Sequence, residues 1–397
     1  MPPTSSRLDL VDALRGFAIV SIMLLHNLEH FDLYHKPAGQ PDWLVMLDQN
    51  IWDGMFFLFA GKSYLIFALL FGVTFHLQDS RRAAAGEDFR PRFAWRMLLL
   101  LGFGMVNSLF YQGDILSFYA VMSFTLLPVA RLRSRAVLAI AAILLLQPYF
   151  WVHVLQALPQ PDAKLADPAS WAYFARTGEY MTGGTMLQTY LGNVTTGKTA
   201  AVLWSWENGR FFQIPAVFML GMLAGRAGVF ALSDANRTFW RRLLVVAALC
   251  FAALYATTRG LDAAVTGQAL QRPLMVIVKS WSNFALMGVI VAVFALLYQR
   301  GTLARALNVF APLGRMSLTS YVSQSVVGTA LYYGFGLGLY QVTGAAACLL
   351  IGVVLALLQG LFSAWWLKRH KQGPLEALWH RATWIGVTNP ALGRPAS

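Results

Sequence analysis

The chain has 397 residues, of which 57% are hydrophobic and only 12% are charged, and its mean hydropathy is +0.54. A soluble domain has about 25% charged residues, so this composition excludes an ordinary soluble enzyme, a disordered chain and a coiled coil. It indicates a polytopic membrane protein. The net charge of +13 would suggest nucleic acid in a soluble chain; here it is typical of topology signalling, and no nucleic-acid partner is expected.

Ten segments are apolar enough to be membrane helices, which need about 20 mostly apolar residues. The first resembles a signal peptide, because Arg7 and Arg15 precede an apolar stretch, but no cleavage site follows and we expect a retained helix. The sequence predicts an all-α polytopic bundle in a single transmembrane domain, residues 1–397. The predicted spans are residues 14–34, 52–78, 95–112, 114–130, 136–157, 211–229, 243–258, 274–298, 316–337 and 344–367.

The basic residues favour alternate loops, and short cytoplasmic loops are the ones enriched in Lys and Arg. Their distribution predicts that both termini are cytoplasmic and that the longest loop, about residues 158–210, lies outside. The enriched segments are 81–96, 131–135, 226–242, 300–315 and 368–394.

Two segments outside the predicted spans have patterns of their own. The outer loop contains Trp171, Tyr173, Trp204 and Trp206, and aromatic residues of this kind usually rest at the membrane interface. A loop of this length is either functional or disordered, and its Trp content favours an ordered cap over the outer face. After the last span, Gly-Pro-Leu-Glu predicts a short helix on the inner interface, about residues 374–385.

Ionisable side chains within a membrane span are functional candidates, because they are costly there. Arg15 and His26 are eleven residues apart, so they share one helix face about 16 Å apart along the axis, and Asp12 can pair with Arg15. One interpretation is a groove with a cationic entrance and a deep imidazole suited to proton transfer. The alternative is that His26 bridges helices by hydrogen bonds and that Arg15 is a positive-inside anchor. His26 and His30 have metal-ligand spacing, but two ligands alone give no reason to expect a metal.

Further polar residues gather toward the outer half of the predicted spans. Lys62 and Lys279 are expected to face a wet cavity, because a lipid-facing lysine at mid-span is costly. Asp53 and Lys62 are nine residues apart and would face opposite sides of a straight helix. Glu207 and Arg210 are either a structural ion pair or part of a site. The other candidates are Asp114, Asn283 and Gln324.

Several motifs resemble those of the YeiB-like DUF418 membrane proteins. The first is Arg7-Leu8 followed by Asp12-Ala13-Leu14-Arg15-Gly16-Phe17-Ala18. The others, in chain order, are Lys62-Ser63-Tyr64 with Leu69-Leu70-Phe71-Gly72, Gly113-Asp114-Ile115-Leu116 with Tyr119-Ala120, Leu313-Gly314-Arg315-Met316-Ser317-Leu318-Thr319-Ser320-Tyr321 with Gln324-Ser325, and Gly373-Pro374-Leu375-Glu376-Ala377-Leu378-Trp379.

That family is grouped with the transmembrane acyltransferases, which include the acyltransferase-3 proteins and the lysosomal heparan N-acetyltransferase. The resemblance implies acyl transfer at a membrane, with acetyl-CoA or another acyl-CoA supplied from the cytoplasm, and a multi-pass protein of the bacterial inner membrane. The acyltransferase-3 pattern is Leu-Arg-Gly, nine residues and a catalytic His, which Leu14-Arg15-Gly16 and His26 match.

The first hypothesis is therefore an acyl-CoA-dependent acyltransferase acting on a hydroxyl or amine of a small-molecule, lipid or glycan acceptor at the outer side. His26 would be the general base or the acyl carrier, and Lys62 or Lys279 would stabilise an oxyanion. The CoA phosphates would be met by Arg15, Arg81, Arg82 and Arg96. The acceptor would be bound by Asp53, Asp114, Glu207, Arg210, Asn283 and Gln324.

The second hypothesis is a transporter of a small anionic molecule that uses the same polar cavity without chemistry. The third is a structural or regulatory membrane component. The lipid bilayer is an expected partner under each hypothesis, and a homodimer is left open.

Overall fold

The computed structural model describes residues 9–385, and within them the chain is helical with no β-strand. Short polar or glycine-containing turns separate the helices, and several helices are broken where the sequence pattern looked continuous. The elements are α1 (Asp9–Leu28), α2 (Asp42–Phe59), α3 (Ser63–Ala84), α4 (Arg90–Phe110), α5 (Leu116–Met122), η1 (Ser123–Thr125), α6 (Leu126–Val129), α7 (Ser134–Leu145), α8 (Pro148–Ala157), α9 (Ala169–Gly183), α10 (Met186–Gly192), η2 (Asn193–Gly197), α11 (Lys198–Glu207), α12 (Arg210–Arg226), α13 (Asp234–Ala264), α14 (Gln268–Tyr298), α15 (Gly301–Leu307), η3 (Asn308–Phe310), α16 (Ala311–Arg315), α17 (Ser317–Tyr332), η4 (Leu339–Gln341), α18 (Ala345–Leu367) and α19 (Pro374–Thr383).

Six helical stretches in the described part of the chain are long and apolar enough to cross a membrane. The multi-pass, all-α prediction is confirmed, whereas the count of about ten spans and the orientation of the termini stay predictions. Four predicted spans fall on α1, α5 to α6, α12 and α17, which are helical but shorter or more polar. The six stretches are Asp42–Ala84, Arg90–Phe110, Ser134–Ala157, Asp234–Ala264, Gln268–Tyr298 and Ala345–Leu367.

Two of the predicted spans contain a break. The span predicted over residues 52–78 is divided between α2 and α3 at Gly61, whose φ of +80° is favourable for glycine and which packs against Asn283. The prediction that Asp53 and Lys62 lie on opposite sides of one straight helix is therefore wrong. The span over residues 136–157 is divided between α7 and α8 at Gln147, which has a left-handed φ of +59°.

Close backbone contacts hold the centre of the bundle together. A Cβ added to Gly72 of α3 would lie 2.0 Å from the carbonyl oxygen of Phe218 in α12, and one added to Gly221 would lie 2.0 Å from that of Leu69. α1 and α16 approach in the same way. Small residues permit such contacts between membrane helices, where packing rather than the hydrophobic effect drives association.

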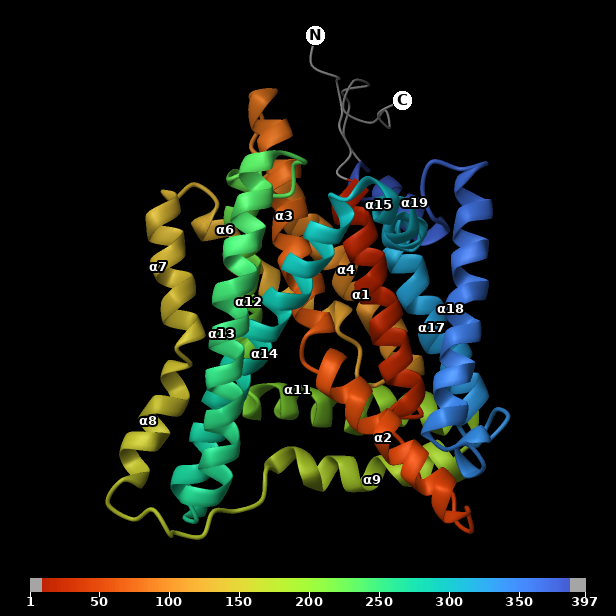
Figure 1. Ribbon diagram of the computed structural model, residues 1–397. Helices are drawn as coiled ribbons and strands as arrows, with labels where there is room; N and C mark the ends of the chain where they lie inside the picture. The colour runs from red at the N-terminus through yellow and green to blue at the C-terminus, as the bar shows by residue number, and fades with distance from the viewer. Residues whose placement is uncertain (1–8, 386–397) are drawn as a thin grey trace.

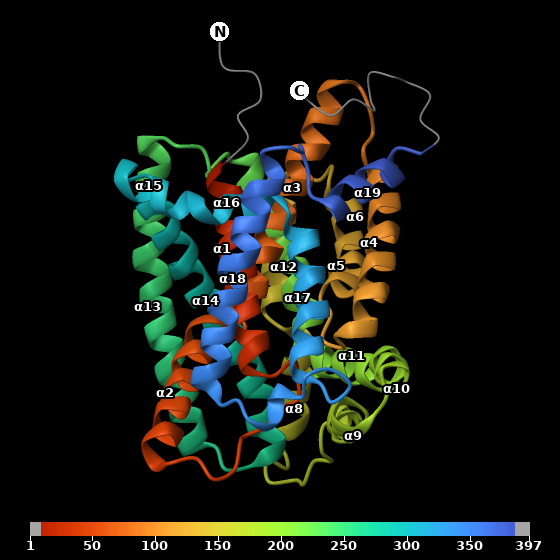
Figure 2. The same ribbon diagram turned by 90° about the vertical axis from the view of Figure 1, so that its right-hand side faces the viewer.

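The two ends of the bundle differ (Figure 1). At one end α9, α10, η2 and α11, residues 169–207, run across the ends of the other helices; we call this group the cap. The predicted outer loop is thus ordered over most of its length. At the other end lie the start of α1, α15, α16 and α19 (Figure 2); we call this end the α19 face. α19 is held there because the indole of Trp379 donates to the carbonyl oxygen of Arg96 (3.0 Å).

The first prediction concerns orientation. Because the Arg-rich segments gather at the α19 face, that face is expected to be cytoplasmic and the cap to be outside. Reporter fusions placed at Arg90 and at Ala166 should report opposite sides of the membrane, with Arg90 inside. A result that puts both positions on one side would contradict the predicted topology.

The second prediction tests the glycine contact between α3 and α12. Gly72→Val should destabilise the purified protein by about 1–3 kcal/mol or more, because the new side chain overlaps the backbone of α12. Gly102→Val on α4 is the control, since nothing lies within 4 Å of a Cβ there. Thermal melting in detergent compares the two, and equal melting temperatures would refute the packing argument.

Candidate functional site

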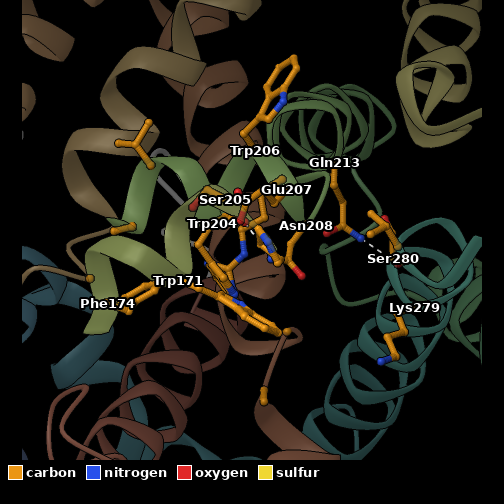
Figure 3. Close-up of a pocket in the computed structure, with 18 of the residues that line it drawn as sticks. Trp171, Phe174, Trp204, Ser205, Trp206, Glu207, Asn208, Gln213, Lys279 and Ser280 are labelled. Atoms are coloured by element: carbon orange, nitrogen blue, oxygen red, sulfur yellow. Dashed lines mark hydrogen bonds between the residues drawn. The ribbon is translucent and has the colours of Figure 1, made fainter. Parts of the chain in front are cut away.

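A large cavity lies between the cap and the bundle, with a volume of about 1590 Å³. Its walls come from α1, α2, α8, α9, α11, α12 and α14, and part of the lining is drawn in Figure 3. The sequence candidates that the structure brings together here are His26, Asp114, Glu207, Arg210, Lys279 and Asn283. The candidates Arg15, Asp53, Lys62, Arg81, Arg82, Arg96 and Gln324 are not among the lining residues.

His26 lies in the last turn of α1 and its ring faces the cavity among aromatic side chains. The imidazole centroid is 4.6 Å from that of Tyr111, 5.6 Å from that of Phe31 and 6.3 Å from that of Tyr321. Among the described residues, no hydrogen bond is formed by the His26 side chain. The interpretation of His26 as a helix-bridging residue is therefore not supported, and the imidazole is free to meet a bound molecule.

His30, one turn farther along the chain, is buried and has hydrogen-bond partners, unlike His26. It is only 2% exposed, and its Nε2 lies 2.9 Å from the carbonyl oxygen of Thr343 and 3.2 Å from the sulfur of Cys348. His30 therefore fixes the end of α1 against the start of α18. Among the described residues there is no group of three or more His, Cys, Asp or Glu that could hold a metal ion.

A left-handed turn follows α1 and sends the carboxylate of Asp32 into the cavity. The backbone φ is 48° at His30, 53° at Phe31 and 75° at Asp32, and such values are costly for residues other than glycine. Asp32 accepts hydrogen bonds from Tyr111 (3.3 Å) and from Gln112 (3.2 Å). Glu29 also lines the cavity. Neither carboxylate was among the sequence candidates. Glu29 lies three residues after His26 and continues the helical hydrogen bonding, so helical spacing could have found it, whereas only the left-handed turn places Asp32 there.

Arg210 and Glu207 do not pair with each other. The Arg210 guanidinium lies between two rings, 4.3 Å from the centroid of Tyr64 and 4.1 Å from that of Trp204. Glu207 instead accepts hydrogen bonds from the backbone N–H (3.1 Å) and the hydroxyl of Ser170 at the start of α9. The alternative of a structural ion pair between them is therefore wrong.

Asp114 joins the cap to the bundle. It accepts hydrogen bonds from the backbone N–H groups of Leu116 (3.2 Å) and Ser117 (2.8 Å), and its carboxylate is 3.5 Å from the ammonium of Lys198 in α11. Lys198, which the sequence analysis missed, also donates to the carbonyl oxygen of Asp114 (3.2 Å). This pair fixes the cap over the cavity.

The remaining outer candidates separate into two groups. Lys279 and Asn283 of α14 line the cavity, beside Gln213, which donates to the carbonyl oxygen of Ser280 (2.7 Å; Figure 3). Outside the cavity, Lys62 is 7% exposed at the break before α3.

Asp53 and Gln324 also lie away from the cavity. Asp53 accepts a hydrogen bond from Gln49 on the exposed side of α2 (2.9 Å), and Gln324 donates to Gln359 of α18 (3.0 Å).

The four arginines predicted to meet CoA lie at the α19 face, and most have protein partners. Arg15 donates to Asp12 (2.8 Å) and to Thr74 of α3 (2.9 Å), so it holds α1 to α3. The Arg96 and Arg82 guanidinium groups lie over the rings of Trp379 (4.1 Å) and Trp384 (4.3 Å) respectively. Arg81 is exposed.

Two family models match the chain. The model described as "Protein of unknown function (DUF418)" matches residues 224–386, and the one described as "Heparan-alpha-glucosaminide N-acetyltransferase, catalytic" matches residues 7–174. The second match includes the part of the chain that contributes His26, Asp32 and Tyr111 to the cavity.

The relatives match over nearly their whole length. The chain is 27% identical to the uncharacterized protein YxaH of Bacillus subtilis, over 96% of this chain and 95% of the relative. It is 26% identical to the uncharacterized protein YeiB of Escherichia coli, over 97% of this chain and 98% of the relative. No solved structure matches. The resemblance to the YeiB-like DUF418 proteins and to the heparan N-acetyltransferase group is confirmed.

Proposed function

We propose that this protein is a membrane acyltransferase that moves an acyl group from acyl-CoA to a hydroxyl or amine acceptor, with His26 as its chemical residue. One observation carries the proposal: the His26 imidazole faces a cavity of about 1590 Å³ and forms no hydrogen bond with another described residue. The match of residues 7–174 to an N-acetyltransferase model supports it. The acyl group, the acceptor and the use of acyl-CoA are parts of this proposal.

The reaction needs one base and one group that stabilises negative charge. His26 accepts the proton of the acceptor hydroxyl or amine while the acceptor oxygen or nitrogen attacks the thioester carbonyl carbon. The C–S bond then breaks, and the CoA thiolate takes the proton from His26. Lys279, which lines the cavity, is the proposed partner of the oxyanion; Lys62 does not line the cavity and is a weaker candidate. In the alternative, His26 itself takes the acyl group and passes it on.

The donor would approach the α19 face, where positive charge gathers. The Arg90 guanidinium, with Arg131 beside it, holds the pKa of Asp88 well below its usual range, so Asp88 is ionised near pH 7 and offsets part of the charge of these two arginines. Arg81 is the best placed of the predicted phosphate partners, because Arg15, Arg82 and Arg96 already contact protein groups.

The breaks in the helices favour a second candidate, a transporter of a small anionic molecule. Ala60 and Gly61 at the α2–α3 break, Tyr149 after the α7–α8 break and Asn208 before α12 all line the cavity. Discontinuous helices around a central site are common in secondary transporters. The two candidates differ in one respect that can be measured: only the first consumes acyl-CoA.

The third prediction tests His26. If it is a general base, His26→Ala should lower acyl turnover on the order of 10²–10⁴-fold without unfolding the protein; if it carries the acyl group, exchange of label between acyl-CoA and CoA should be lost as well. The assay follows CoA release and label exchange with the purified protein.

The matched control is His35→Asn, since His35 is exposed and does not line the cavity; it should keep full activity. His26→Asn can form one of the hydrogen bonds of an imidazole but cannot transfer a proton. Wild-type turnover in His26→Asn would end the catalytic proposal, and saturable uptake without CoA release would favour the transporter.

The fourth prediction concerns the donor. CoA at millimolar concentration should raise the melting temperature of the purified protein by mass action, and Arg81→Ala should reduce that rise because one phosphate partner is lost. Arg259→Ala is the control, because Arg259 is exposed and belongs to α13, away from Arg81. A folded sample that shows no shift with CoA would move the conclusion to the transporter.

A further inference from the structure

The cavity is larger than one small polar substrate requires. Sites for small ligands usually have volumes of about 300–1,000 Å³, whereas this one has about 1590 Å³. The reacting end of a thioester and a small acceptor would leave much of it filled with water. The part of the cavity that lies away from His26 therefore has room for a further portion of a bound molecule.

The two sides of the cavity differ in chemistry. The side near His26 presents Glu29, Asp32 and Arg210. Another part of the lining comes from α2, α8 and α14. Here α2 presents the apolar side chains Phe56 and Phe59, and α8 and α14 add Phe150, Met275 and Val276 beside polar groups such as His153, Lys279 and Asn283. Water against the apolar side chains of this wall is unfavourable, and a hydrocarbon chain would remove it.

α2 is the thin part of this wall. None of its 18 residues is buried, because one side of the helix faces the cavity through Phe56 and Phe59 while the other faces outward. The outward side exposes 65% of Met46 and 44% of Leu58. α2 also packs on α13, where the ring centroids of Phe57 and Phe251 are 5.9 Å apart, and its exposed side chains beside this contact are the part of the wall expected to face the bilayer.

We propose that the acceptor is an amphiphile whose hydroxyl or amine head lies at His26 and whose hydrocarbon chain lies against α2 and α14. The role of this amphiphile as an acceptor rests on the proposed function. Its binding in the cavity does not, because binding requires no acyl transfer. A chain in this position takes the place of water along the apolar side chains of these helices. Each added methylene should tighten binding about fourfold, measured against the aqueous concentration.

The experiment uses the full-length protein in nanodiscs and 1-octanol with a photoreactive diazirine at the end of its chain. After illumination, peptide mapping should find label on residues 56–60 of α2 and on Met275 or Val276 of α14. Unlabelled 1-octanol should compete this label away, 1-hexanol should compete at a concentration about 16-fold higher, and glycerol, which has hydroxyls but no chain, should not compete. Label confined to lipid-facing positions would overturn the proposal.

α18 provides the control within the same molecule. Leu361 and Phe362 are 69% and 43% exposed and do not line the cavity. Any label on them should come from probe dissolved in the bilayer, so competitor should not remove it. Phe56→Ala should weaken competition by 1-octanol several-fold, whereas Phe362→Ala should not change it. Equal behaviour of α2 and α18 would also overturn the proposal.

The outcome is independent of the acyltransferase assay. Saturable label on α2 and α14 without acyl turnover would leave the amphiphile site standing and remove the proposed reaction. Acyl turnover that is insensitive to the chain of the acceptor, together with label that octanol does not compete, would keep the reaction and remove the amphiphile.

Discussion

The close approach of helix backbones is the constraint on which the rest of the structure depends. In a bilayer no hydrophobic force drives one apolar helix onto another, so packing and hydrogen bonds must do so. Gly16 of α1 meets the carbonyl oxygen of Phe310, and Gly314 meets that of Asp12. With Gly72 and Gly221 between α3 and α12, these contacts fix α1 and α3 in the centre. The end of α1, and with it His26, is thereby placed at the cavity.

The end of α1 shows how one helix supplies both an anchor and a reactive group. His30 is buried with Thr343 and Cys348 as partners, whereas His26 faces the cavity. Phe31, which is fully buried, fills the space behind the left-handed turn. The packing of His30 and Phe31 offsets the unfavourable backbone conformation, so that the carboxylate of Asp32 is held in the cavity instead of being exposed at a helix end.

The sequence was a good guide to features that local spacing determines. Composition predicted a multi-pass helical protein, and the spacing of Arg15 and His26 placed them on one helix. The pattern after Gly373 predicted the helix that the structure contains as α19. The last two predictions depend on residues within a few turns of one another, where the helical period is informative.

Features that depend on distant contacts could not be predicted. The break at Gly61 is tied to Asn283, more than 200 positions away, and the break at Gln147 to the hydroxyl of Ser280 (2.9 Å). Lys198 became a site residue only through Asp114. For the same reason periodicity could not show that Arg210 stacks between Tyr64 and Trp204 rather than pairing with Glu207.

The cap and the site share hydrogen-bond partners, which bears on how a substrate could be enclosed. Gln112 donates to Asp32 in the cavity (3.2 Å) and accepts from the hydroxyl of Tyr180 in α9 (3.1 Å). Asp32 in turn accepts from Tyr111, whose ring lies against His26. A movement of α9 away from the bundle would remove one partner of Gln112 and loosen its hold on Asp32. On the proposed function, the cap and the surroundings of His26 are therefore coupled, because a closed cap is the state in which Asp32 and Tyr111 are held in place beside the base.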